Sequence, residues 1–70
     1  MSQSEFPVRL RELREKQHKS RLRVSQLCGL PDGAIRKYER GEASPNIDSL
    51  VAIADYFHVS TDYLLGRTNY

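Results

Sequence analysis

The side chains that could carry out catalysis are few and scattered in this 70-residue sequence. His18 and His58 lie in opposite halves of the chain, and neither has a cysteine or a second histidine as a close neighbour. Metal sites need clustered ligands, so we expect no metal. Cys28 falls on an apolar helical stripe, which is typical of a buried structural thiol rather than a nucleophile. Because a glycine-rich phosphate loop and paired carboxylates are also absent, the sequence predicts no enzyme and no cofactor.

The charged residues are divided unevenly between the two parts of the chain. Residues 1–41 hold ten lysines and arginines against five acids, a net charge of +5. Residues 42–70 hold one arginine against four acids, a net charge of −3. A basic half joined to an acidic half favours a polyanionic partner on one side of the molecule.

Six of the basic residues flank Gly29: Lys19, Arg21 and Arg23 precede it, and Arg36, Lys37 and Arg40 follow it. Two short helices joined by a tight glycine turn form a helix-turn-helix motif, whose second helix enters the major groove of DNA. Cations around such a turn neutralise phosphates and release counterions. From this pattern alone, an ordinary helical hairpin with a charged face remains the alternative.

The sequence pattern predicts that five short helices position these cations, and it predicts no strand. Phe6, Leu10 and Leu13 form the stripe of a first helix that ends near 17–19. Ser20 caps a second helix at about 20–28, and a third follows at about 31–40. A fourth helix begins near 46–48 and runs to Phe57, and a fifth lies between the caps Ser60 and Gly66. The expected fold class is all-α, with one domain at 6–66 and short tails at 1–5 and 67–70, the second of which we expect to be frayed.

Helices of this length are marginal alone, so a shared core must hold them. We expect that core to contain Leu10, Leu13, Val24, Cys28, Ile35, Ile47, Leu50, Ile53, Ala54, Phe57, Val59 and Leu64. No apolar run is long enough to span a membrane, and no secretory signal is visible at the start. A single cysteine cannot form an internal disulfide, which favours a reducing cytoplasm.

Several short sequences occur in an order that resembles a known family. They are LRELREK at 10–16, the Gly29 turn, IRKYERG at 35–41, Pro45, Leu50, and VSTDYLLG at 59–66. Together they resemble the lambda-repressor/Cro-type (Xre-like) helix-turn-helix DNA-binding family over about residues 6–66. The resemblance implies a compact five-helix fold, in which helix 20–28 crosses the DNA backbone and helix 31–40 is the recognition helix.

The resemblance also assigns roles to individual residues. Arg14 and Glu39 match a pair that forms an ion pair between the first helix and the end of the third. Ser20 and Arg21 match positions that lie against a phosphate. The residues expected to contact DNA are Lys19, Ser20, Arg21, Asp32, Gly33, Arg36, Lys37 and Arg40, of which Arg36 and Lys37 are the best candidates to read bases.

The chain departs from the family at the start of the third helix. The family usually has a Ser or Thr cap there, and this chain has Pro31, Asp32 and Gly33. Pro31 can serve as the first helical residue, or Asp32 can cap a shorter helix, or Asp32 can accept from cytosine N4. Because Gly33 has no side chain to read a base, we expect modest specificity with a contribution from indirect readout.

The function implied by the resemblance is sequence-specific binding of double-stranded DNA by a transcription regulator, a repressor of phage or mobile-element type. We expect it to bind a palindromic operator as a homodimer. The dimer contacts would come from the fifth helix and tail or from the acidic face of the fourth helix. The alternative is a degenerate helix-turn-helix that binds another protein, as an anti-repressor or antitoxin does.

Overall fold

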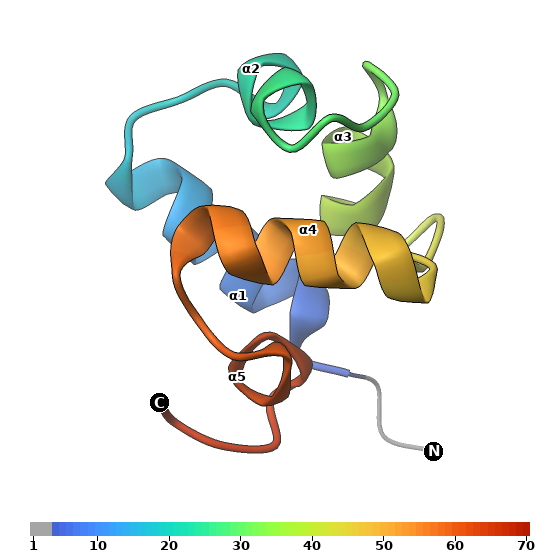
Figure 1. Cartoon of the computed structure of the whole chain (residues 1–70). Coiled ribbons are helices and arrows are strands. Elements are labelled where there is room, and N and C mark those ends of the chain that lie inside the picture. Colours follow the sequence, from blue (N-terminus) through green and yellow to red (C-terminus); the bar gives the residue numbers. More distant parts are fainter. Residues whose placement is uncertain (1–3) are drawn as a thin grey trace.

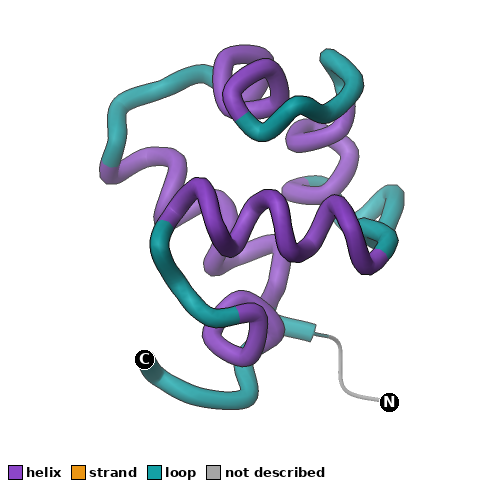
Figure 2. Tube along the Cα trace, in the orientation of Figure 1, coloured by secondary structure: helices purple, strands orange, loops and turns teal. Residues whose placement is uncertain are grey.

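Five α-helices form the part of the chain that the computed structural model describes, residues 4–70. They are α1 (Phe6–Lys16), α2 (Arg21–Leu27), α3 (Ala34–Glu39), α4 (Ile47–Phe57) and α5 (Thr61–Leu65). In Figure 1, α4 crosses in front of α1, with α2 and α3 at one end of the molecule and α5 at the other. Figure 2 shows helices and loops only, so the described residues contain no strand. The predicted all-α fold of five helices is confirmed. Residues 1–3 belong to the expected tail 1–5 and to the start of the chain, where no secretory signal is expected, and they lie outside the described residues.

Side-chain caps begin three of the five helices. Ser20, Asn46 and Ser60 each accept a hydrogen bond from the backbone amide three residues ahead, at 3.0, 2.7 and 3.0 Å. These bonds satisfy amides that have no partner within the helix. The predicted caps at Ser20 and Ser60 are thus confirmed.

Two histidines lie just past the ends of α1 and α4 in the left-handed backbone conformation. His18 has a φ of 56° and His58 a φ of 58°. This conformation lets the chain leave a helix sharply while its amide returns to the last turn, as the His58 amide does to the Asp55 carbonyl at 3.2 Å. The histidines therefore have a structural place at helix ends, where glycine is the commoner residue.

The core lies between α1, α3, α4 and α5, with Val24 reaching it from α2. Its buried apolar residues are Phe6, Leu10, Val24, Ala34, Ile35, Tyr38, Ile53, Ala54, Phe57 and Leu64. Leu13, Cys28, Leu50 and Val59 pack against this cluster while partly exposed. The prediction of Ile47 as a core residue is wrong, because its side chain is 80% exposed. Ile47 is the first residue of α4, and its side chain remains outside the cluster.

The start of the third helix also differs from the prediction. The helix begins at Ala34 rather than near residue 31, and its N-cap is Gly33, which makes no side-chain cap. Pro31 and Asp32 form a turn ahead of it, closed by the Ala34 amide on the Pro31 carbonyl at 3.0 Å. Pro31 as first helical residue and Asp32 as cap are both wrong. Glycine costs about 1 kcal/mol relative to alanine inside a helix, which favours the turn over another helical turn here.

The segment after α5 is held against α1 by the guanidinium of Arg9. Arg9 donates to the backbone carbonyls of Tyr63 at 2.9 Å and Thr68 at 2.6 Å. Its guanidinium carbon also lies 4.4 Å from the centre of the Tyr63 ring. These contacts connect α1 to Thr68, in the tail that we expected to be frayed. No helix within residues 4–70 is long and apolar enough to cross a membrane.

Candidate nucleic-acid interface

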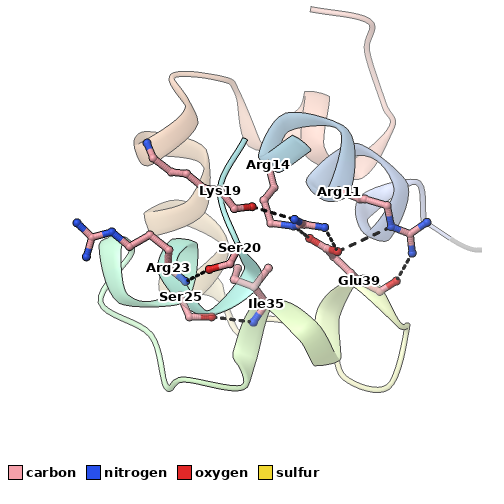
Figure 3. A network of polar contacts seen from close by, with 8 residues as sticks. All are labelled: Arg11, Arg14, Lys19, Ser20, Arg23, Ser25, Ile35 and Glu39. Atoms are coloured by element: carbon pink, nitrogen blue, oxygen red, sulfur yellow. Dashed lines mark hydrogen bonds and ion pairs between the residues drawn. The ribbon is translucent and has the colours of Figure 1, made fainter. Parts of the chain in front are cut away.

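Helices α2 and α3 pack against each other across a tight turn. Gly29 takes a φ of +72°, which only glycine adopts readily, and the Leu30 amide donates to the Ser25 carbonyl at 2.8 Å. The hydroxyl of Ser25 accepts from the Ile35 amide at 3.2 Å, in the first turn of α3 (Figure 3). One residue of α2 therefore bonds both the turn and the second helix.

An ion pair joins the first helix to the end of α3. Arg14 donates from Nε to Oε2 of Glu39 and from Nη2 to Oε1 at 3.0 Å. The Glu39 side chain is 0% exposed and that of Arg14 is 13% exposed. The hydrogen bonds from Arg14 to Glu39 raise the pKa of Arg14, against the opposing effect of its burial. Such a bidentate buried pair fixes the orientation of the two helices.

Two further contacts extend this pair. Arg14 also donates from Nη1 to the Lys19 carbonyl at 2.9 Å, so the same guanidinium holds the residue before the cap of α2. Arg11 donates from Nη2 to the Glu39 carbonyl at 3.3 Å, and its Nε lies 3.8 Å from Oε1 of Glu39. Figure 3 shows Arg11 and Arg14 converging on Glu39 from α1. The start of α2 and the end of α3 are therefore fastened to the same two turns of α1.

An open hollow of about 450 Å³ lies between the start of α2 and the start of α3. It is lined by Arg14, Ser20, Arg21, Leu22, Asp32, Gly33 and Arg36. Arg21 and Arg36 are exposed there, and Asp32 is the one carboxylate in the lining. The structure thus brings five of the residues expected to contact DNA around one hollow, namely Ser20, Arg21, Asp32, Gly33 and Arg36.

A second hollow, of about 260 Å³, lies between α3 and the loop that follows it. It is lined by Pro31, Gly33, Ala34, Lys37, Tyr38, Ala43 and Ser44. Lys37 is exposed there, whereas Arg36 lines the first hollow, and Gly33 lines both. The exposed face of α3 therefore presents Arg36 to the first hollow and Lys37 to the second. Gly33, the N-cap of the helix, has no side chain to present to either.

Lys19 and Arg40 take part in other contacts. The Lys19 ammonium donates to the Tyr56 hydroxyl at 3.0 Å and to Oε1 of Gln17 at 3.2 Å, and it lies 5.6 Å from the centre of the Tyr56 ring. Arg40 forms an exposed ion pair with Glu42 at 2.7 Å. Neither side chain lines a hollow beside α3. Of the predicted contact residues, these two stand apart from the rest.

Sequence reasoning did not single out Ser25 or Arg11. Ser25 is completely buried in α2 beside Val24, so a small polar residue on the apolar stripe was the available signal. A buried hydroxyl needs a hydrogen-bond partner, and here that partner is the Ile35 amide. The role of Arg11 depends on which helix lies opposite, which the sequence pattern does not specify.

The described residues include no group of three or more histidine, cysteine or acidic side chains that could hold a metal ion. Burial raises the pKa of the Cys28 thiol. A thiol with a raised pKa carries less of the thiolate that nucleophilic catalysis requires.

The fold and the packing of α2 on α3 define a helix-turn-helix protein. A helix-turn-helix family model matches residues 10–64, and the chain belongs to this family. The resemblance to lambda-repressor-type domains is thereby confirmed.

Relatives of known name are transcription regulators. The chain is 32% identical over 59 residues to the HTH-type transcriptional regulator ImmR of Bacillus subtilis (strain 168), which covers 84% of this chain and 46% of that protein. It is 36% identical over 59 residues to the cryptic phage CTXphi transcriptional repressor RstR of Vibrio cholerae, covering 84% and 53%. The chain spans about half the length of these relatives. They are named as regulators and not as enzymes, in agreement with the prediction from sequence.

Solved structures of a repressor and of a transcriptional regulator have a fold similar to that of this chain. The P22 c2 repressor in complex with a synthetic operator superposes with a TM-score of 0.81 at 32% identity, covering 86% of this chain and 91% of that one. A transcriptional regulator from Listeria innocua superposes with a TM-score of 0.83 at 29% identity, covering 93% and 61%. The repressor-like fold is therefore shown along nearly the whole described chain.

Proposed function

We propose that this chain binds double-stranded DNA in a sequence-specific way and acts as a transcription regulator, a repressor of phage or mobile-element type. The observation that carries the proposal is the exposed pair Arg36 and Lys37 on a short helix that the buried Arg14–Glu39 pair anchors to α1. The similarity to an operator-bound repressor supports the same function.

In this proposal α3 lies in the major groove of DNA. The two hollows beside α3 face the sugar-phosphate backbones that border the groove. Arg36 and Lys37 donate to guanine O6 and N7, a contact worth about 1–3 kcal/mol of discrimination. Ser20 and Arg21, on the rim of the first hollow, contact a phosphate. Asp32 makes no cap, so its exposed carboxylate is free to accept from cytosine N4.

We further propose that two copies bind a palindromic operator, in the cytoplasm where the Cys28 thiol stays reduced. The described α3 has six residues, and only Arg36 and Lys37 on it carry long exposed donors. So few readers give limited discrimination from one half-site. Two half-sites, with centres about 34 Å apart on one face of DNA, double the number of base contacts.

Selection of binding sites from random duplex DNA by the purified chain tests the proposal. We expect a two-fold symmetric consensus, and affinity that falls with salt by about 0.9 log units per phosphate contact for each tenfold rise in salt. Arg36→Ala should weaken binding, while Lys16→Ala is the matched control, because Lys16 is an exposed cation of α1 that lines neither hollow. Failure to bind any duplex at low salt would contradict DNA binding.

A second candidate function is binding to another protein. Leu22 and Leu27 on α2 are 48% and 40% exposed, and Asp32 places a negative charge in the hollow that holds Arg21 and Arg36. Exposed leucines on α2, together with a carboxylate that opposes phosphate contacts, suit a protein partner better than DNA. Measurement of duplex binding at low salt distinguishes the two functions, because the second predicts no binding to DNA.

A further inference from the structure

The first turn of α3 lacks the side-chain cap that begins α2, α4 and α5. Its N-cap is Gly33, which has no side chain, and neither Pro31 nor Asp32 takes over that task. The first amides of a helix have no partner within the helix, and a buried amide without a partner is costly. The Ile35 residue that carries one of these amides is completely buried.

Ser25 supplies the missing partner from the other helix. Its hydroxyl oxygen accepts from the Ile35 amide at 3.2 Å, and its side chain is itself 0% exposed. Its carbonyl accepts from the Leu30 amide at 2.8 Å, on the far side of the Gly29 turn. Figure 3 shows the hydroxyl of Ser25 aimed at the start of α3.

The residues next to Ile35 are the ones proposed to read bases. Arg36 and Lys37 follow it directly, and α3 ends two residues later at Glu39. The end of this short helix is held by Arg14, while its beginning is held by Ser25. A six-residue helix has little stability of its own, so loss of either attachment frees a large fraction of its length.

We propose that Ser25 is a positioning residue for DNA readout: its hydroxyl acts as a cap supplied by α2 that keeps the first turn of α3 wound. The inference rests on the proposed DNA-binding function. It predicts that Ser25 governs discrimination between sequences, through Arg36 and Lys37, more than it governs total attraction to phosphates.

The test compares Ser25→Ala with Ser60→Ala. Both substitutions remove a serine hydroxyl that accepts from a backbone amide, but Ser60 caps α5 and lies outside the two hollows beside α3. Affinities are measured for a selected site and for a scrambled duplex, at a temperature where circular dichroism shows each variant to be folded. We expect Ser25→Ala to reduce the ratio of the two affinities roughly tenfold, as loss of a buried hydrogen bond allows, and Ser60→Ala to leave it unchanged.

Amide hydrogen exchange supplies the second readout. The Ile35 amide should exchange faster in Ser25→Ala, while the Ile53 amide in α4 changes only as much as global stability does. If Ser25→Ala folds poorly, Ser25→Cys keeps a similar size with a weaker acceptor and should show the same two effects. An affinity ratio within twofold of that of the unaltered protein would overturn the proposal.

Separate outcomes would contradict DNA binding and the role of Ser25. If the unaltered chain binds no duplex at low salt, the proposed function is wrong, and with it the role of Ser25 in readout. If the unaltered chain binds selectively and Ser25→Ala keeps that selectivity, only the role of Ser25 in readout is wrong.

Discussion

The guanidinium of Arg14 on α1 donates two hydrogen bonds to the carboxylate of Glu39 on α3, whose side chain is fully withdrawn from solvent. Two charges of opposite sign are therefore removed from water together, and each depends on the other. The same arginine holds the Lys19 carbonyl ahead of α2. The pair is thus the point at which α1 fixes both helices of the motif.

Removal of the arginine alone should be strongly destabilising. We expect Arg14→Ala to lower the free energy of unfolding by about 3 kcal/mol or more, because Glu39 stays buried without its partner. Urea denaturation at low temperature measures the loss. For a chain of this size, such a loss is a large fraction of the total stability.

Two control variants separate burial of the charge from loss of an arginine. Arg11→Ala removes a half-exposed arginine at the same carboxylate and should cost less than about 1 kcal/mol. Replacement of both partners, Arg14→Met with Glu39→Leu, removes the isolated charge and should recover part of the loss. Equal losses for Arg14→Ala and Arg11→Ala would contradict this account.

The salt dependence of DNA binding should distinguish Lys37 from Lys19. Lys37 is exposed beside α3, whereas the Lys19 ammonium is already bonded to Tyr56 and Gln17. If Lys37 contacts a base edge or phosphate, Lys37→Met weakens binding to the selected site and lowers the magnitude of the salt slope by up to about 1. We expect Lys19→Met to change the slope less than Lys37→Met does.

Tyr56→Phe is the matched variant for Lys19. It removes the hydroxyl that accepts from Lys19 but keeps the ring, so it should lower the melting temperature by a few degrees, as Lys19→Met does. A full unit of lost slope for Lys19→Met would instead place Lys19 on a phosphate.

Features that depend on nearby residues could be predicted from the sequence. Ser20 and Ser60 cap helices because a serine before an apolar stripe satisfies an amide three residues ahead. Leu10 in α1 and Ile53 in α4 are buried because each lies on the apolar face of its own helix. Such signals fix the five helices and most of the core.

Features that depend on tertiary contacts could not be predicted. The start of α3 depends on Ser25, which lies ten positions before Ile35 in the sequence and bonds to it only after the turn forms. Ile47 continues the apolar pattern of α4 but extends beyond the core. The segment after α5 is hydrogen-bonded to Arg9, whose partners lie near the other end of the chain. Each of these features depends on which residues the fold brings together, and local sequence patterns do not contain that information.

The close approach of Glu5 to Gly66 should make this glycine difficult to replace. Gly66 has a φ of +82°, and a Cβ added there would lie 2.5 Å from Cγ and 2.6 Å from Cβ of Glu5. Gly66→Ala therefore combines left-handed strain with a steric clash, and we expect a loss of about 2–4 kcal/mol in the free energy of unfolding.

Gly29→Ala is the control for backbone strain alone. Gly29 has a φ of +72°, but nothing lies within 4 Å of an added Cβ. Its replacement should cost only the left-handed penalty, about 1–2 kcal/mol. Thermal denaturation of both variants checks the difference, and equal losses would show that the segment before α1 moves aside without cost.

The thiol of Cys28 should make stability depend on pH in the alkaline range. Burial raises its pKa above the ordinary thiol value of about 8.5. As the pH rises past that value, the unfolded chain loses the proton first and the folded chain keeps it. The folded state then binds more protons than the unfolded state, so stability from this group is present at lower pH and is lost as the pH rises through the folded pKa.

Comparison with Cys28→Ala isolates this contribution from the other groups that titrate. The difference in unfolding free energy between the two proteins should be constant from pH 6 to about 8 and then shrink toward pH 10. Alkylation by iodoacetamide at pH 8 should also be slower for the folded protein than in urea, because the raised pKa reduces the thiolate fraction. A stability difference that grows with pH would mean that the folded state stabilises the thiolate, which is the opposite of what its partly buried position on the core predicts.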